Sequence, residues 1–277
     1  MRLKQVFITI ATIFITTNGI AQSKEDINLP EGGDDLSFYG TIEVFITKNQ
    51  EVFNKEKKFN FYDDISNFIL NKSKLPMLER RVLLYADNKV KYSFIDKIKQ
   101  EIALVEKMLF LMTDTIEKPK KGYSIYLNSY LNRGKEQTSI LTLEQDLKNE
   151  AFNSMVPPPP LPPPSMWYHE FEDILYSGKK EIIEDVLKKH SYKTLNVTSN
   201  KVLKYKQEII NNNDLTKVLK ENDIVLLKFD KDIYYEDYIY AIQEIKKLKS
   251  LEKSRTYIVE ISYELENLLN KINVSID

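Results

Sequence analysis

The chain has 277 residues, 42% of them hydrophobic, and its 40 basic residues nearly balance 41 acidic ones. This composition is typical of a globular protein, and a formal net charge of -1 offers no electrostatic basis for binding nucleic acid or an anionic membrane. The chain contains no cysteine, which excludes a disulfide framework, so each core must be held by packing alone.

The first 21 residues have the pattern of a secretory signal peptide. Two basic residues precede an apolar run at 6–15, and small residues at 19–21 stand at the usual cleavage spacing. We expect cleavage, with a mature protein that begins near Gln22. The alternative is an uncleaved membrane anchor through residues 5–21, for which ten apolar residues are short of the ~20 that span a bilayer.

One block of sequence occurs twice and organises the rest of the chain. Val82–Ile102 and Val225–Ile245 align at a constant offset of 143, and eight of their 21 positions are identical, where chance would give about one or two. Each copy is a short apolar run, then a turn led by Asp87 or Asp230, then a helical pattern. We interpret the block as an internal repeat of a strand, a turn and a helix.

The repeat extends to both sides of this block. Upstream, each copy has two short strands around a polar turn and then a short helix, and downstream it has a closing strand. The expected equivalents are strands at 41–45 and 49–52 matching 194–197 and 200–202, helices beginning near Asp64 and Asp214, and closing strands at 109–112 and 257–261. Each copy is therefore predicted to run strand, strand, helix, strand, helix, strand.

The repeat also divides the chain into domains. We expect a leader segment at 22–40, copy one at 41–115, a connector at 116–166, and copy two at 167–277 with its core at 193–263. In the connector, 123–127 and 139–143 are expected to form a hairpin that lengthens the first sheet. Residues 157–164 hold seven of the ten prolines and predict polyproline II. We interpret this run as a stiff spacer; the alternative is a docking ligand for an aromatic-lined groove.

Two further helical patterns flank the core of the second copy. Residues 167–190 and 264–272 each carry apolar residues along one face. We expect these stripes to pack into a core or between domains, and the alternative is a partner-binding groove.

The sequence offers few residues with catalytic or metal-binding chemistry. Its two histidines are His169 and His190, and it has no HExxH pattern, no Gly-rich phosphate loop and no GxSxG motif. His190 follows two lysines at an expected helix C-terminus, where a cation complements the helix dipole. No catalytic residue, metal site or cofactor is predicted, and the chain is not expected to be an enzyme.

The first copy resembles the periplasmic domain of the ExbD/TolR family of biopolymer-transport proteins. The resemblance is carried by the order of elements, by the segment 27–30 before the first strand, and by Asp87, Val90 and Tyr92 between strand and helix. It covers residues 26 to about 114, and more weakly 193–263. It implies an α+β fold of two small mixed-sheet domains, each with about two helices packed on one face of its sheet.

The resemblance also implies a compartment and partners. Family members work in inner-membrane complexes that couple the proton gradient to transport across the outer membrane, so the chain is expected in the periplasm, or at the inner membrane if it is uncleaved. The implied partners are a TonB-like or TolA-like energy transducer and a channel-forming protein. The family keeps an acidic residue in its transmembrane helix, whereas 4–21 contains no Asp or Glu, so proton-driven work is not implied for this chain.

Family periplasmic domains self-associate, so two copies in one chain predict an internal pseudo-dimer. If the copies pack, an edge strand of each should be shielded, leaving at most one edge per domain for a partner. If a stiff spacer holds them apart, each domain should offer its own edge.

Four residues are candidates for partner binding: Asp87, Tyr92, Asp230 and Tyr235. The structural interpretation of the two aspartates is that a side-chain oxygen tethers the turn between strand and helix. The functional interpretation is that they shape the loop over which a partner strand docks. The two tyrosines are expected either in the core or at the contact.

Two functions remain open. The first is a non-catalytic envelope interaction module that binds a partner strand by sheet-edge pairing, as an accessory to energised transport. The second is an envelope hydrolase or binding protein that shares only the fold. Carboxylates clustered in a concave pocket would favour the enzyme, and an open sheet edge without a pocket would favour the module.

Overall fold

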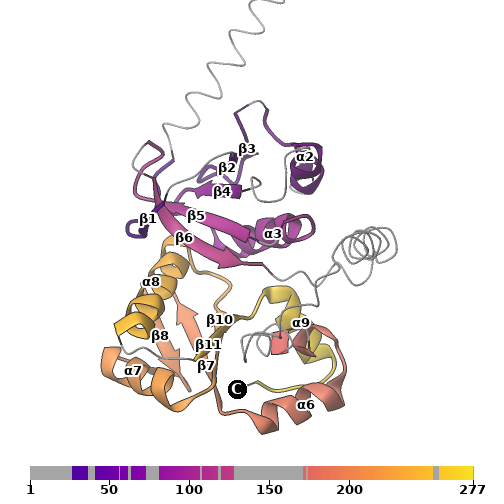
Figure 1. The fold of residues 1–277 in the computed structure, drawn as a ribbon, viewed down its shortest axis with the longest axis vertical. Coiled ribbons are helices and arrows are strands. Elements are labelled where there is room, and N and C mark those ends of the chain that lie inside the picture. Colours follow the sequence, from indigo (N-terminus) through magenta and orange to yellow (C-terminus); the bar gives the residue numbers. More distant parts are fainter. Residues whose placement is uncertain are drawn as a thin grey trace, which may run out of the picture.

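The computed structural model describes residues 27–36, 41–55, 57–61, 64–72, 81–106, 108–117, 120–127, 171–172, 174–251 and 256–276 (Figure 1). Several sequence predictions lie outside these residues: the signal peptide, part of the leader, the second hairpin strand, the Pro-rich spacer and His169. Within the described part, the chain forms two mixed sheets, and this confirms the predicted α+β fold.

The first half forms a six-stranded sheet in the order β1-β6-β5-β4-β2-β3. Strands β2, β4 and β5 are parallel, and the other pairs are antiparallel. The elements of this half are β1 (Asp34–Leu36), β2 (Thr41–Ile46), β3 (Val52–Phe53), α2 (Asp64–Lys72), β4 (Arg81–Ala86), α3 (Tyr92–Ala103), β5 (Met108–Thr113) and β6 (Lys120–Tyr126).

The second half forms a five-stranded sheet in the order β11-β10-β7-β8-β9. Strands β11, β10 and β7 are parallel, and β8 and β9 are antiparallel additions. Its elements are α6 (Lys180–Lys189), β7 (Tyr192–Thr198), β8 (Val202–Tyr205), β9 (Glu208–Ile209), α7 (Asn212–Glu221), β10 (Ile224–Phe229), α8 (Tyr235–Leu251), β11 (Tyr257–Glu260) and α9 (Tyr263–Lys271).

The two halves share one order of elements. The series β2, β3, α2, β4, α3, β5 in the first half matches β7, β8, α7, β10, α8, β11 in the second. The first sheet extends beyond 41–115, because β1 comes from the leader and β6 from the connector. Strand β6 overlaps the predicted strand at 123–127 and lengthens the sheet, pairing with β5 on one side.

Both faces of each sheet are covered. One face of the first sheet packs on α2 and α3, and its opposite face carries the stacked rings of Phe45, Phe53 and Tyr85, with centroids 5.3 and 4.9 Å apart along the stack. One face of the second sheet packs on α7 and α8, and the other on α6 and α9. Two-sided burial explains why β4 and β10 are nearly continuous apolar runs.

The helix ends follow local sequence signals. Asn211 caps α7, because its side chain accepts a hydrogen bond from the backbone N–H of Asp214. The side chain of Asp214 accepts one from the backbone N–H of Asn211, and this reciprocal pair is a capping box. Ser262 caps α9 by accepting from Leu265 N at 3.1 Å. Leu265 and Leu269 of α9 are buried. This confirms that the apolar stripe at 264–272 packs into the core.

The two halves contact each other through equivalent positions of the repeat. Tyr92 N donates to Ile233 O at 2.9 Å, and Tyr235 N donates to Val90 O at 2.8 Å, so the two turns exchange the same pair of hydrogen bonds. Lys91 and Tyr234 form an isolated bridge at the centre of this exchange. Such a reciprocal contact is the signature of a twofold axis, here a pseudo-twofold within one chain.

Helices α3 and α8 add side-chain packing to this contact, and one continuous apolar cluster contains residues of both halves. The halves therefore meet through turns and helices. The sequence analysis expected that packing would shield an edge strand of each copy; the backbone contacts between the copies come from the two turns, and side-chain packing comes from the helix that follows the central strand of each copy.

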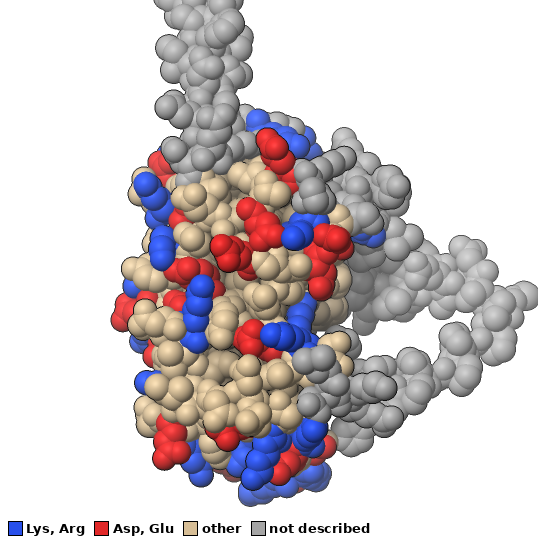
Figure 2. Space-filling model, turned by 90° about the vertical axis from the view of Figure 1, so that its left-hand side faces the viewer, with Lys and Arg blue, Asp and Glu red and all other residues tan. Residues whose placement is uncertain are grey.

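The outer surface carries mixed charge. Figure 2 shows Lys and Arg interspersed with Asp and Glu on one face of the molecule, without a field of one sign. In the part of the chain that the structure describes, no helix is long and apolar enough to cross a membrane.

Candidate functional site

The aspartates at equivalent positions of the repeat have different surroundings. Asp87 follows β4 and is 1% exposed, and its carboxylate accepts from Asn28 N at 3.0 Å and from Lys89 N at 2.9 Å. It therefore tethers both the turn and the leader segment. Asp230 follows β10 and is exposed, and its backbone carbonyl accepts from Tyr263 Oη at 2.9 Å. Only Asp87 has the buried tethering role.

The two candidate tyrosines lie between the halves. Tyr92 is 1% exposed and Tyr235 is fully buried. The ring of Tyr238 stacks on both, with centroids 4.5 Å from Tyr92 and 6.1 Å from Tyr235. Burial raises the pKa of Tyr235 far above its usual range. These rings are core residues of the internal interface, because neither presents a surface on which a separate partner could dock.

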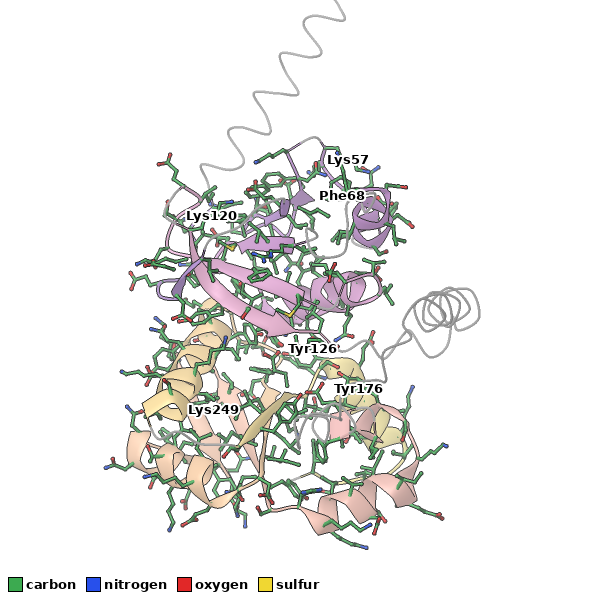
Figure 3. The ribbon with its side chains drawn as sticks, in the orientation of Figure 1. Lys57, Phe68, Lys120, Tyr126, Tyr176 and Lys249 are labelled. Atoms are coloured by element: carbon green, nitrogen blue, oxygen red, sulfur yellow. The ribbon has the colours of Figure 1, made fainter. Side chains whose placement is uncertain are left out.

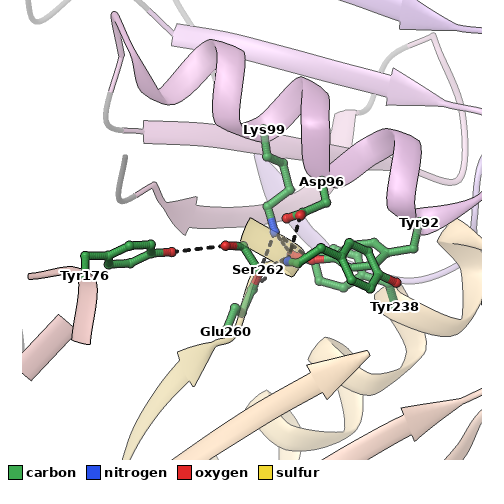
Figure 4. Close-up of polar contacts among 8 residues, drawn as sticks. Tyr92, Asp96, Lys99, Tyr176, Tyr238, Glu260 and Ser262 are labelled. Carbon is green, nitrogen blue, oxygen red and sulfur yellow. Dashed lines mark hydrogen bonds and ion pairs between the residues drawn. The ribbon is translucent and has the colours of Figure 1, made fainter. Parts of the chain in front are cut away.

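A polar cluster that the sequence analysis did not single out lies beside these rings (Figure 4). Lys99 of α3, whose side chain is 6% exposed, is at its centre. Its ammonium group donates to Tyr92 Oη at 3.2 Å, to Tyr238 Oη at 3.1 Å and to Glu260 Oε2 at 2.5 Å. Glu260 stands at the end of β11, so this ion pair joins the two halves.

The hydroxyl of Tyr238 also donates to Glu260, at 2.9 Å to Oε1. Burial raises the pKa of both Tyr92 and Tyr238 well above the usual range, so both phenols remain protonated and act as neutral hydrogen-bonding groups. Lys99 and Glu260 form the ion pair of the cluster, and the hydroxyls of Tyr92 and Tyr238 add hydrogen bonds to it.

Asp96 lies one helical turn before Lys99. Its Oδ2 accepts from Tyr263 N at 3.2 Å, which ties α3 to the start of α9. Burial raises the pKa of Asp96 to about 6, although the nearby charge of Lys99 acts in the opposite direction. On the far side of the cluster, Tyr176 Oη and Ser262 Oγ are 3.5 Å apart.

The two copies of the repeat differ in sequence at this cluster. At an offset of 143, Asp96 corresponds to Ile239 and Lys99 to Ile242, so at these two buried positions the first copy has ionisable residues and the second has isoleucines. A sequence signal was present in this contrast: two ionisable residues stand where the other copy has two isoleucines.

A cleft of about 270 Å³ opens next to the cluster. The first half lines it with α3 and β6, and the second half with α8 and β11, so the cleft exists only because the halves are packed together. Figure 3 labels Tyr126, Tyr176 and Lys249, which line the cleft from β6, from the segment before α6 and from α8. Interfaces between domains are common places for binding sites.

The cleft meets the edges of two strands. Neighbouring residues of a strand project to opposite faces of the sheet, yet four consecutive residues at 124–127 line the cleft, as do Tyr257 and Ile258 of β11. Strand β1 pairs with β6 only as far as Gly122, and β11 is the last strand of its sheet. Within the described residues, both edges facing the cleft therefore lack a strand partner.

The backbone direction of β11 follows from its hydrogen bonds. Tyr257 N donates to Asp223 O and Ile261 N to Leu227 O, both at 2.8 Å, so these groups point toward β10. Since alternate residues of a strand point the same way, the N–H groups of Ile258 and Glu260 point outward at the free edge.

The charged side chains of the cleft differ in the hydrogen-bond partners that they have. The carboxylate of Glu172 accepts from Tyr257 Oη, and that of Glu260 binds Lys99 and Tyr238. The ammonium of Lys246 donates to the carbonyl of Ser124 at 3.1 Å, which is a neutral partner. Burial lowers the pKa of Lys246 and of Lys249.

The cleft thus combines the two features that were expected to separate an enzyme from an interaction module. It is concave and holds three carboxylates, and it also exposes two strand edges. Two of the carboxylates are bound to a cation or a phenol, and the third, Asp96, is bound to a backbone N–H. Among the described residues, no group of three or more His, Cys, Asp or Glu side chains could hold a metal ion.

No family model matches this sequence, and neither a curated protein nor a solved structure matches it. The class of protein is therefore argued from the site itself.

Proposed function

We propose that this chain is a non-catalytic interaction module of the bacterial cell envelope, which binds an extended segment of a partner protein in the cleft between its two halves. The segment pairs with the outer edge of β11 or β6 through backbone hydrogen bonds, in the manner of an added strand. The observation that carries this proposal is the cleft lined by two strand edges, one from each half, that have no strand partner among the residues the structure describes.

The sheet edges suit an extended ligand for two reasons. An unpaired edge presents a row of N–H and C=O groups that only another extended backbone can satisfy together. The side chains around the edges, among them Ile125, Tyr126, Ile245 and Ile258, supply apolar surface for alternate side chains of the segment. Edge pairing gives affinity that depends little on sequence, and the apolar surface gives selectivity.

The setting of this function follows from the resemblance to the ExbD/TolR family. We place the mature chain in the periplasm, exported by residues 1–21, as an accessory to an energised outer-membrane transport or envelope complex. The partner would be a TonB-like or TolA-like energy transducer or a channel-forming protein. The internal pseudo-dimer would replace the self-association of two separate family domains, because the second copy is already present in the chain.

A peptide selection with edge variants tests the proposal. Random eight-residue peptides displayed on phage are selected on the chain from Gln22 onward, and affinities of the enriched peptides are measured by fluorescence anisotropy. Ile258→Pro removes one outward N–H of β11 and leaves the bonds to β10 intact, since proline is tolerated at an edge. We expect affinity to fall about tenfold, the equivalent of about 1.4 kcal/mol for a lost backbone bond.

The matched control is Ile209→Pro on β9, the edge at the opposite side of the same sheet. Ile209 is 70% exposed, and the bond from Ile210 N to Leu203 O shows that the Ile209 N–H also points outward. This variant should bind the enriched peptides as the parent does. Enrichment of no peptide, or equal losses at the two edges, would refute binding at the cleft.

A further inference from the structure

The side of the cleft formed by α8 carries positive charge that the described residues do not neutralise. The side chain of Lys249 is partly buried, and within the described part of the chain it makes no hydrogen bond or ion pair. Lys246 stands one turn earlier on the same side of the helix, with its ammonium against the carbonyl of Ser124 and the ring of Tyr123, 5.0 Å from the ring centroid. Neither of its contacts is an anion.

This arrangement costs free energy. Burial removes water from both ammonium groups and lowers the pKa of each, although the charges of Asp34 and Glu260 act in the opposite direction at Lys246. A carboxylate brought between the two lysines by a ligand would restore the lost interactions, and its attraction would be strongest where water is excluded.

The three carboxylates of the cleft each have a hydrogen-bond donor within the described residues, unlike Lys249. Glu260 binds Lys99, Glu172 accepts from Tyr257, and Asp96 accepts from Tyr263 N. Gln100 also lines the cleft, is 7% exposed and carries no charge, and its side-chain oxygen is buried without a partner in the described structure.

We propose that the segment bound in the cleft is acidic: an extended stretch of a partner protein in which one Asp or Glu side chain lies between Lys246 and Lys249. Residues flanking this carboxylate alternate between apolar side chains on the cleft wall and side chains directed to solvent. This inference rests on the proposed strand-binding function and specifies the chemistry of its partner.

Charge reversal in the cleft tests the inference. The phage selection of eight-residue peptides is repeated on Lys246→Glu/Lys249→Glu and on Lys247→Glu, an exposed position of the same helix. The parent and Lys247→Glu should enrich peptides with an Asp or Glu among alternating apolar residues. The double variant should enrich peptides with Lys or Arg at that place, because the sign of the cleft is reversed.

Affinities then measure the size of the effect. Replacing the enriched Asp or Glu by its amide should weaken binding to the parent about tenfold, and should change binding to Lys246→Gln/Lys249→Gln less than twofold. The Lys246→Gln/Lys249→Gln variant removes both charges and introduces no new one, so it serves if the glutamate variant fails to fold.

The outcomes separate the two proposals. Enrichment of neutral alternating peptides by all the variants would overturn the acidic segment and leave strand binding standing. Enrichment of no peptide by any of them would overturn both. A third outcome is that all library peptides bind weakly and that a peptide of residues 139–150 of this chain displaces them. This would show that the chain fills its own cleft, and it would also overturn the proposal.

Discussion

Replacement of Lys99 by methionine should weaken the attachment of the two halves more than any surface change. The substitution keeps the aliphatic packing but removes the cation that binds Glu260, Tyr92 and Tyr238. Removing one partner of a buried ion pair costs about 3 to 5 kcal/mol because the other charge stays buried. The side chain of Glu260 is 25% exposed and regains some hydration, so we expect about 3 kcal/mol.

For a chain of this size, a loss of about 3 kcal/mol corresponds to a melting temperature lower by about 6 to 12 °C. Urea unfolding at pH 7 and calorimetry measure the two quantities. The matched control is Lys97→Met, an exposed lysine on the same helix, which should change the unfolding free energy by less than about 0.5 kcal/mol.

A double-mutant cycle isolates the pair itself. Because Glu260→Gln removes the charge that Lys99→Met leaves unpaired, the double variant should lose at least about 1 kcal/mol less than the sum of the single variants. Equal effects of Lys99→Met and Lys97→Met, or strictly additive losses in the cycle, would refute the reasoning that a buried pair joins the halves.

Three further predictions follow from single positions. The raised pKa of Asp96, about 6, means that the folded chain holds this proton more tightly than the unfolded one, so ionisation removes stability as the pH rises from about 4 to 6. Asp96→Asn should therefore stabilise by about 2 to 3 kcal/mol at pH 7 and little at pH 4 in urea unfolding; a gain independent of pH would contradict this. Asp87→Ala should lower the unfolding free energy by about 2 to 3 kcal/mol, and its repeat equivalent Asp230→Ala by less than about 0.5 kcal/mol, by the same measurement. A loss for Asp87→Ala as small as that for Asp230→Ala would contradict the tethering role. Gly122→Ala should cost more than about 2 kcal/mol because its Cβ would lie 2.2 Å from Leu111 O. Gly178→Ala, at φ +66 with its Cβ 3.5 Å from the side chain of Leu268, an ordinary contact, should cost about 1 kcal/mol, as thermal melts would report.

The repeat made much of the fold predictable. Periodicity and turn residues are local properties, and they indicated strands and helices in both copies before any contact was known. The turn at Asp87 was likewise predictable, since an aspartate that follows a strand can accept from the N–H groups of its own turn. The bond from Asn28 N to the same carboxylate was not, because it spans 59 residues.

The candidate site was largely hidden from the sequence. Lys99 and Glu260 are 161 residues apart, and no spacing rule relates them. The sequence predicted a strand that overlaps β6. It could not predict that one edge of this strand is free, because that depends on which other strands pair with it in the folded sheet. The cleft needs both halves, and the four sequence-selected residues, Asp87, Tyr92, Asp230 and Tyr235, do not line it.

The sequence by itself determined that the chain contains the same series of strands and helices twice, because side-chain alternation and capping act within a few residues along the chain. Only the tertiary structure decided which surfaces of the two copies meet. That choice depends on the summed burial of α3, α8 and the turns exchanged between them, and it brings together the Lys99 cluster and two strand edges that no local pattern connects.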